Sequence, residues 1–290
     1  MISMDAQKAK DVSILAQRIR IATLREFKAI GFGHIGGSMS IVEVLAALYG
    51  SIMKYDPQKP QWEERDWLVV SKGHAGPAVY AALALSGFFP VEQLDTLNQG
   101  GTNLPSHCDR NKTPGIDMTT GSLGQGISTA IGVALGHKLD KKDNFVYLIL
   151  GDGECNEGQI WEGVQFAAHW NVDHLITFVD ANKKQLDGYT QDINNLSGLA
   201  EKFACFGWHS LEVDGHDVVQ IIEAVEKAKQ VKGKPSVIIL NTTKGKNCCF
   251  AETVFLNHHM VITGDMADEA IKELETAMAE CGCGEGGATK

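Results

Sequence analysis

Residues 145–153 read FVYLILGDG, and residues 175–182 read LITFVDAN. Each begins with a short apolar run of the kind that forms a strand buried on both faces of a parallel sheet. The first run leads directly into Asp152, the second ends at Asn182, and residues 158–170 between them are expected to form a helix. This β-α-β unit would put a polar side chain at the carboxyl end of each strand, where open α/β sheets bind their ligands.

These two side chains suit a magnesium ion that carries a diphosphate. Mg²⁺ prefers six oxygen ligands, of which Asp152 and Asn182 can supply two and a backbone carbonyl just after Asn182 a third. Gly151 and Gly153 would let the diphosphate lie against the main chain. A helix that begins near Glu157 would point its N–H groups and its dipole at the phosphates.

Apolar runs and helical patterns alternate through the rest of the chain. Further strands are expected at residues 67–71, 208–213 and 235–240, and helices at residues 5–30, 41–54, 77–86, 197–206, 218–231 and 267–280. Ser40 to Glu43 would form a capping box for the helix at residues 41–54. We therefore expect a doubly wound, mostly parallel α/β sheet of at least five strands with helices on both faces, followed by a flexible Gly-rich tail at residues 281–290.

The composition narrows the class of protein. The chain has 290 residues, of which 44% are hydrophobic and 21% are charged, as is usual for globular proteins. Its net charge of −10 argues against nucleic acid or an anionic membrane as the main partner. No apolar stretch is long enough to span a membrane and no signal-peptide core is visible, so the seven cysteines are expected to be reduced thiols in a cytoplasm.

The segment at residues 119–126 (TTGSLGQG) opens a helix that is expected to continue to residue 138 and is unusually rich in small residues. Its small positions are Gly124, Ala130, Gly132, Ala134 and Gly136. Glycine is a poor helix former, so the pattern needs another reason. A tightly packed internal helix is one explanation, and we favour a helix that also lies at a contact between subunits.

Three histidines lie in loops. His34 stands among four glycines, and His74 follows the expected strand at residues 67–71. His107 lies in the long loop at residues 98–117. For His34 taken alone, an ordinary polar loop residue and a ligand contact are about equally good interpretations. Histidines can donate hydrogen bonds to phosphate or sugar hydroxyls and can pass protons near neutral pH.

Other kinds of site are less favoured. A single Gly-Asp-Gly is common as a turn, and the histidines lie in separate loops without the Cys-x-x-Cys pair of many zinc sites. Residues 248–249 (CC) and 281–283 (CGC) could bind a metal jointly, although unpaired thiols are the more economical interpretation. No G-x-G-x-x-G follows an early strand, which weighs against a dinucleotide site.

Taken together, the motifs resemble those of the transketolase family. Residues 151–159 (GDGECNEGQ), 180–182 (DAN) and 185–188 (QLDG) are similar to its thiamine diphosphate motif. Further segments follow in the family's order: residues 33–37 (GHIGG), residues 71–74 (SKGH), His107, residues 119–126 and residues 214–217 (DGHD). The resemblance extends from about residue 30 to about residue 258. Jointly these motifs are highly specific, whereas each alone is not.

The resemblance implies a thiamine diphosphate-binding domain over residues 1–280 and a role for each matching residue. The cation (Mg²⁺, or Ca²⁺ or Mn²⁺) would be held by the side chains of Asp152 and Asn182 and by the carbonyl of Lys184. The cofactor would be contacted by His74, Gly121, Leu123, Gly151, Gly153, Glu154, Asn182 and Leu186. The substrate channel and its chemistry would involve His34, His74, His107 and His258. Near the contact between active sites, the matching acidic positions are Glu157 and Glu162.

The segment after the last expected strand departs from the family. Residues 255–259 (FLNHH) have Asn257 where the family often has tryptophan ahead of its last active-site histidine. His258 is the aligned histidine and His259 is its competitor. The loop at residues 247–252 also diverges. These departures affect the choice of sugar more than cofactor binding, and the sequence leaves open whether the substrates are pentose phosphates or a modified sugar.

The resemblance also implies a partner chain. A transketolase has a second domain, which carries the glutamate that activates the cofactor, and a third domain, and no part of this sequence matches either. We therefore expect the N-terminal subunit of a split transketolase, which transfers a two-carbon ketol unit between sugar phosphates together with a C-terminal subunit in an α2β2 assembly. The alternatives are a component of another thiamine diphosphate enzyme, similar to deoxyxylulose phosphate synthase or to the α chain of a 2-oxo acid dehydrogenase, and a non-catalytic paralogue.

Overall fold

A computed structural model describes residues 6–280, so the predicted tail at residues 281–290 lies outside the described part of the chain, as do residues 1–5. Its helices are α1 (Ala6–Ile30), α2 (Ile35–Met39), α3 (Val42–Ala47), α4 (Gly76–Leu85), α5 (Gln125–Leu139), α6 (Gly158–His169), α7 (Thr190–Ile193), α8 (Leu199–Cys205), α9 (Val218–Lys229), α10 (Cys249–Glu252) and α11 (Gly264–Glu280). Shorter helical turns are η1 (Leu48–Ile52), η2 (Gly73–Ala75), η3 (Val91–Thr96) and η4 (Gly153–Asn156). Within residues 6–280, no helix is long and apolar enough to cross a membrane.

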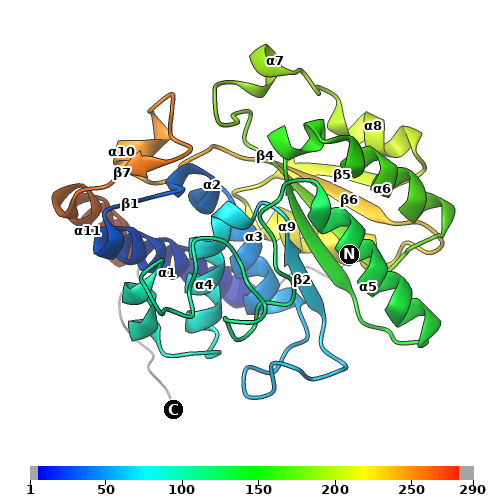
Figure 1. The fold of residues 1–290 in the computed structure, drawn as a ribbon, viewed down its shortest axis with the longest axis horizontal. Helices are drawn as coiled ribbons and strands as arrows, with labels where there is room; N and C mark the ends of the chain where they lie inside the picture. The colour runs from blue at the N-terminus through cyan, green and yellow to red at the C-terminus, as the bar shows by residue number, and fades with distance from the viewer. Residues whose placement is uncertain (1–5, 281–290) are drawn as a thin grey trace.

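A parallel sheet of five strands forms the centre of the fold (Figure 1). Its strands are β2 (Trp67–Val70), β3 (Val146–Gly151), β4 (Leu175–Ala181), β5 (His209–Asp214) and β6 (Ser236–Asn241). They lie in the order β2-β3-β4-β6-β5, and every neighbouring pair is parallel. All five predicted strands are therefore present within two residues of their expected bounds, which confirms the fold class.

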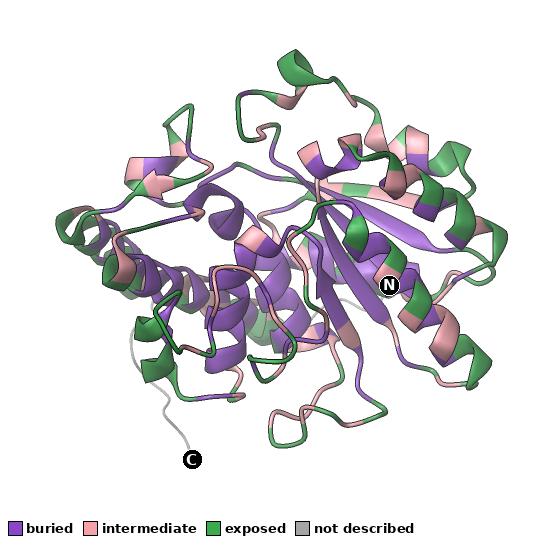
Figure 2. Ribbon diagram, viewed as in Figure 1, coloured by how far each residue is buried: buried purple, intermediate pink, exposed green. Residues whose placement is uncertain are grey.

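Strands β2, β3, β4 and β6 are mostly buried between helices, whereas the edge strand β5 is partly exposed, as Figure 2 shows by the colour of the strands. Successive residues of a strand point to opposite faces, so Tyr147 and Ile149 join one apolar core and Leu148 and Leu150 join the other. The first core is shared with α1, α3, α4 and α9, and the second with α5, α6 and α8. Helices on both faces leave the carboxyl edge of the sheet as the place for a ligand.

The segment that follows α1 folds differently from the prediction. A small antiparallel pair, β1 (Phe32–Gly33) with β7 (Met260–Val261), joins it to the end of the chain. The predicted helix at residues 41–54 is divided into α3 and the π-helical turn η1. The predicted capping box is wrong, because the hydroxyl of Ser40 donates to Asp180 at 2.6 Å and Glu43 binds Arg20 at 2.6 Å. Tertiary partners have taken both side chains away from the helix end.

The segment at residues 214–217 supports the loop that leaves β6. Asp217 caps α9 by accepting hydrogen bonds from the amides of Val219 at 2.9 Å and Gln220 at 3.2 Å. The neighbouring His216 accepts a hydrogen bond from the amide of Thr243 at 2.8 Å and faces Glu43 at 3.2 Å. The chain after β6 is thereby attached to α3 and α9, which fixes where its next residues can reach.

Candidate active site

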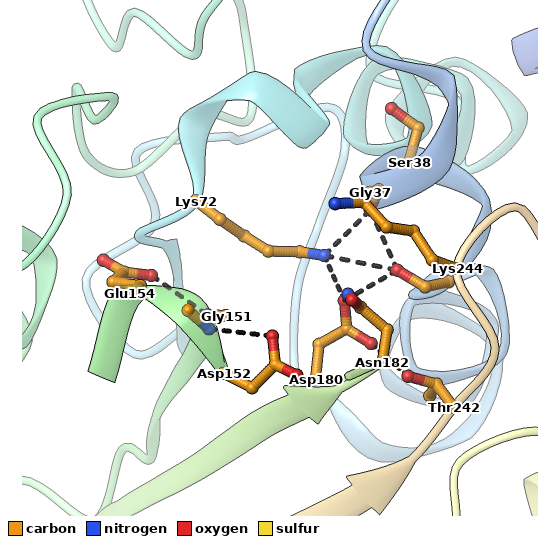
Figure 3. Close-up of polar contacts among 12 residues, drawn as sticks. Gly37, Ser38, Lys72, Gly151, Asp152, Glu154, Asp180, Asn182, Thr242 and Lys244 are labelled. Carbon is orange, nitrogen blue, oxygen red and sulfur yellow. Dashed lines mark hydrogen bonds and ion pairs between the residues drawn. The ribbon is translucent and has the colours of Figure 1, made fainter. Parts of the chain in front are cut away.

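Asp152 and Asn182 lie next to each other at the carboxyl edge of the sheet (Figure 3). Gly151 at the end of β3 pairs in register with Asp180 on β4. The carboxylate of Asp152 accepts hydrogen bonds from the amides of Gly153 at 2.8 Å and of Lys183 at 2.6 Å. The carboxylate of Asp152 therefore lies against the turn after β4 that carries Asn182 and Lys184, the other two residues expected to hold a cation.

Burial disfavours the ionised form of the Asp152 side chain. It raises the pKa of Asp152 to about 7, and the nearby carboxylate of Asp180 adds to the effect. A cation beside Asp152 would relieve this cost, because an opposite charge favours the ionised form. Within residues 6–280, no three His, Cys, Asp or Glu side chains gather into a metal site of their own. A cation here would thus need amide, carbonyl and ligand oxygens as well.

Asp180 is the centre of a buried network that lies beneath this edge. Its carboxylate binds the ammonium of Lys72 at 2.5 Å and accepts from Thr242 at 2.5 Å, from Ser40 at 2.6 Å and from Asn182 at 2.7 Å. Lys72 also donates to the carbonyl of Gly37 at 2.8 Å, and both charged side chains are almost fully buried. The pKa of Asp180 is held low chiefly by the Lys72 ammonium against the opposing effect of burial. The network orients Asn182 from behind.

Glu154, predicted to contact the cofactor, has its carboxylate engaged by the protein. It accepts hydrogen bonds from the amides of Gly151 at 3.0 Å and Gly124 at 2.9 Å and from the hydroxyl of Ser71. These partners lie at the ends of β3 and β2 and at the start of α5. In this arrangement Glu154 joins the segments that surround the site, and a direct cofactor contact stays a prediction.

Glycines allow the loop before α5 to lie directly on the turn that carries His74. A Cβ at Gly73 would lie 2.8 Å from the backbone of Thr120 and Gly121, and one at Gly121 would lie 2.9 Å from the ring of His107. Gly121 also has φ +139°, which disfavours other residues. The same loop exposes Leu123, and Leu186 is exposed on the loop after β4, with 39% and 59% of their surfaces accessible.

The predicted histidines come together in one cluster, although they lie far apart in the sequence. The ring centroid of His34 lies 5.4 Å from that of His74, 5.6 Å from His107 and 5.4 Å from His258. His74 and His258 are 4.8 Å apart. His259 also approaches His34, at 4.8 Å, but it lies on the side of Phe32. His258 remains our aligned residue because it faces both His74 and Lys244.

These rings are neutral at neutral pH. Burial lowers the pKa of His34 to about 4, with help from the neighbouring His259. Burial and then the Lys244 ammonium lower the pKa of His258 to about 3. Burial also lowers the pKa of His74 and of His107. A neutral ring has one donor and one acceptor nitrogen, so the cluster can hold hydroxyl and carbonyl groups without adding positive charge.

The lowered pKa values predict a loss of stability in acid. Below about pH 6.5 the unfolded chain takes up protons on His34 and His258 that the folded chain refuses. Stability contributed at pH 7 should therefore be lost progressively as the pH falls from about 6.5 towards about 4. Thermal unfolding of the wild type and of a His34→Gln, His258→Gln double variant, measured from about pH 7.5 to about pH 4.5, should show a smaller loss in the variant.

The exposed His169 at the end of α6 provides the control, because its replacement by glutamine should leave the wild-type pH dependence unchanged. Equal pH slopes for the double variant and the wild type would contradict the prediction.

Three important side chains are not identified as site residues by the sequence. Lys72 and Asp180 lie within the motifs at residues 71–74 and 180–182, but nothing in the local pattern shows that the two pair across the sheet edge. Lys244 belongs to the polar segment leaving β6, and it is almost fully buried beside His258. A lysine at the carboxyl end of a buried strand is the signal that could have found both cations.

Comparison with known proteins agrees with this geometry. Residues 12–279 match the family described as transketolase, thiamine diphosphate binding domain. The chain is 57% identical to the 6-deoxy-6-sulfo-D-fructose transketolase subunit SqwG of Clostridium sp. (strain MSTE9), over 91% of this chain and 96% of that protein. It is 38% identical to one of the apulose-4-phosphate transketolase subunits of Phocaeicola vulgatus, over 83% of this chain and 86% of that protein.

Solved structures give the same result. Transketolase from Leishmania mexicana superposes with a TM-score of 0.84 at 29% identity, covering 92% of this chain and 41% of that one. Transketolase from Campylobacter jejuni gives a TM-score of 0.85 at 27% identity, covering 93% of this chain and 43% of that one. The chain therefore belongs to the transketolase family, in which it corresponds to the N-terminal, thiamine diphosphate-binding domain and to the subunits formed by that domain.

Proposed function

We propose that this chain is the thiamine diphosphate-binding subunit of a two-component transketolase, which moves a two-carbon ketol unit from a ketose to an aldose together with a C-terminal subunit. One observation carries the proposal. The oxygen groups around Asp152 and the histidine cluster meet through a single side chain, because Lys244 contacts the carbonyl of Lys184 at 3.1 Å and His258 at 3.0 Å. A cofactor tail and a sugar could thus be held side by side.

The residues at the sheet edge fit magnesium and thiamine diphosphate. Asp152, Asn182 and the carbonyl of Lys184 would hold the cation, and the buried charge of Asp152 favours one. Gly151, Gly153 and His74 would lie along the diphosphate, with Glu154 supporting them. The exposed side chains of Leu123 and Leu186 would cover the apolar faces of the cofactor rings, together with the backbone of Gly121. When bound, thiamine diphosphate supplies a nucleophilic carbon and an electron sink.

The histidines would do this chain's share of the chemistry. His34 and His107 have lowered pKa values and are neutral, so each can donate to a substrate oxygen with one nitrogen and accept from a hydroxyl with the other, whereas His258, whose Nδ1 lies against Lys244, offers Nε2 alone. Positioned groups of this kind orient the sugar and move protons as its carbon–carbon bond breaks. Burial by a partner chain would exclude water from the same space.

The partner would supply what this chain does not offer. In this proposal a C-terminal subunit binds the cofactor's other end and carries the activating glutamate, in a cytoplasmic α2β2 assembly. The surface of α5 and α6 supports a contact between chains: Gly132 and Gly136 face open space, and Phe166 and Trp170 are exposed. Exposed aromatic rings are enriched on surfaces that another chain covers, and glycines that face open space would let such a chain approach closely.

For the donor, we propose 6-deoxy-6-sulfo-D-fructose. The relative with that sugar in its name is 57% identical, against 38% for the relatives named after apulose 4-phosphate.

A reconstituted enzyme tests the function. This chain, its C-terminal partner, magnesium and thiamine diphosphate should transfer a ketol unit from 6-deoxy-6-sulfofructose to an aldose phosphate, faster than from fructose 6-phosphate. Either chain alone should be inactive. Faster transfer from fructose 6-phosphate would overturn the donor, decarboxylation of pyruvate without ketol transfer would favour another thiamine diphosphate enzyme, and no turnover with any donor would favour a non-catalytic paralogue.

A further inference from the structure

Lys244 is a buried lysine with three defined polar neighbours, and burial lowers its pKa to about 8, which leaves it mostly protonated at neutral pH. Its side chain leaves the loop after β6, and only 3% of the residue is exposed. The ammonium lies 3.1 Å from the carbonyl of Lys184, 3.4 Å from the carbonyl of Gln185 and 3.0 Å from Nδ1 of His258. A lysine ammonium has three N–H donors and no acceptor. Two donors are directed at carbonyls, which can only accept, and the third is directed at the imidazole.

We propose that Lys244 is a positioning residue that fixes the tautomer of His258, so that Nδ1 accepts from lysine and Nε2 carries the proton. This inference deepens the proposed function and rests on it for the statement that Nε2–H then meets a sugar oxygen. Among the hydrogen bonds described for residues 6–280, His258 makes one at Nδ1 and none at Nε2, which leaves Nε2 to a ligand. Which imidazole nitrogen is protonated depends on the bond made by the other one.

Hydrogen bonds from Asn257 and Gly36 fix the backbone of the segments that carry Lys244 and His258. The side chain of Asn257 donates to the carbonyls of Lys244 and Ala251, both at 2.9 Å. The carbonyl of Asn257 accepts from the amide of Gly36 at 3.0 Å, and the carbonyl of Gly36 accepts from the amide of Gly245 at 3.1 Å. The segments around Gly36, Lys244 and Asn257 are therefore joined through backbone as well as side-chain bonds.

The backbone at Gly36 is closely packed against both Asn257 and Lys244. A Cβ at Gly36 would lie 2.3 Å from the carbonyl oxygen of Asn257 and 2.9 Å from the side chain of Lys244. Asn257 is the residue that departs from the family pattern, and its buried amide supports the lysine directly. Asn257 and Lys244 are thus linked by a hydrogen bond, and the side chain of Lys244 in turn contacts His258.

One ammonium consequently serves both parts of the site. It donates to the carbonyl of Lys184, beside the expected cation. It also determines which nitrogen of His258 carries the proton. His258 would act as a hydrogen-bond donor to an oxygen that gains negative charge, and it would not act as a base through Nδ1. A donor directed at developing charge is among the larger contributions to catalysis.

Imidazole nitrogen NMR tests the tautomer directly. The chain, labelled with ¹⁵N-histidine, is measured alone and with its partner at about pH 7.5, where a histidine of lowered pKa is neutral, and a His258→Gln variant assigns the signals of His258. The wild type should show an unprotonated Nδ1 and a protonated Nε2, and Lys244→Met should shift His258 to a mixture of tautomers. A wild-type ring protonated at Nδ1, or the same spectrum in Lys244→Met, would overturn the proposal. The wild-type measurement stands even if the variant fails to fold.

Kinetics with the partner provide the second readout. Lys244→Met should lower kcat and kcat/KM together by about 100-fold, as expected when a donor used in the transition state is lost. Lys246→Met is the matched control, because that lysine lies on the same loop but pairs with Glu252 near the surface at 3.5 Å and should leave kcat unchanged. A kcat for Lys244→Met within about threefold of wild type would overturn the positioning role. If no sugar is turned over by the wild type, the proposed function fails, whereas the tautomer result remains valid.

Discussion

Replacing Lys72 with methionine should lower the free energy of unfolding of this chain by about 3–5 kcal/mol, because it leaves the carboxylate of Asp180 buried without its cation. Both side chains are at most 2% exposed, so water cannot take the place of the lost ammonium. The hydroxyl and amide donors of Ser40, Thr242 and Asn182 remain, but they cannot neutralise a charge. Urea unfolding followed by circular dichroism measures the change.

Lys28 is the matched control for this experiment. It pairs with Asp268 at 2.6 Å, but 43% and 57% of the two side chains are exposed. Lys28→Met should therefore cost less than about 1 kcal/mol. If the two lysine variants unfold at the same urea concentration, the buried ion pair contributes no more to stability than the exposed one.

Replacing Asp152 with asparagine should abolish metal-dependent binding of thiamine diphosphate, with a loss of affinity of about 100-fold or more. Folding of the chain alone should not suffer. Asparagine keeps one acceptor oxygen, for the amide of Gly153 or of Lys183, and loses the other acceptor, but it also removes a buried carboxylate whose pKa is raised to about 7. A raised pKa in the folded state means that the ionised form destabilises the fold, so removing the charge offsets the lost hydrogen bond and the variant should be about as stable as the wild type at about pH 7.5.

Calorimetry with thiamine diphosphate and magnesium, in the presence of the partner, measures the affinity, and thermal unfolding without ligands measures the stability. Asp143→Asn is the control: Asp143 lies just ahead of β3, whereas Asp152 follows the same strand directly. Unchanged affinity in Asp152→Asn would show that the oxygen site lies elsewhere, and a large loss of stability would show that Asp152 is structural.

The sheet can be predicted from the sequence because each of its strands has a clear local pattern. The runs at residues 145–150 and 175–179 are apolar on both faces, and the helices between strands have the matching period. Parallel pairing then puts Asp152 and Asn182 at one edge whatever the strand order is. The strand order β2-β3-β4-β6-β5 does not follow from these patterns, since it depends on how the connecting helices pack.

Long-range pairing sets the limit of prediction. Ser40 and Glu43 have the local pattern of a helix cap, but stronger partners at Asp180 and Arg20 bind them in the folded chain. Lys72 and Lys244 each follow a buried strand, which marks them as candidates, but the partners that each one binds are visible only in the folded chain.

The histidines show the same limit. The convergence of His34, His74 and His107 follows from their places in loops at one edge of the sheet and from the family resemblance. The choice between His258 and His259 does not follow, because both rings approach His34 and adjacent residues differ only in which neighbours they face. Only the three-dimensional contacts of His258 with His74 and Lys244 separate the two.

The network around Asp180 also determines when the site can form during folding. Its bonds to Ser40, Lys72 and Thr242 span 140, 108 and 62 residues of chain, so none of them can be made by a local fragment. Contacts of such high sequence separation form late, because closing each loop costs entropy before the contact is gained. The bond from Thr242 can form only after β6 has been synthesised and has paired. The complete network behind Asn182 is therefore available only in a chain whose sheet includes β6.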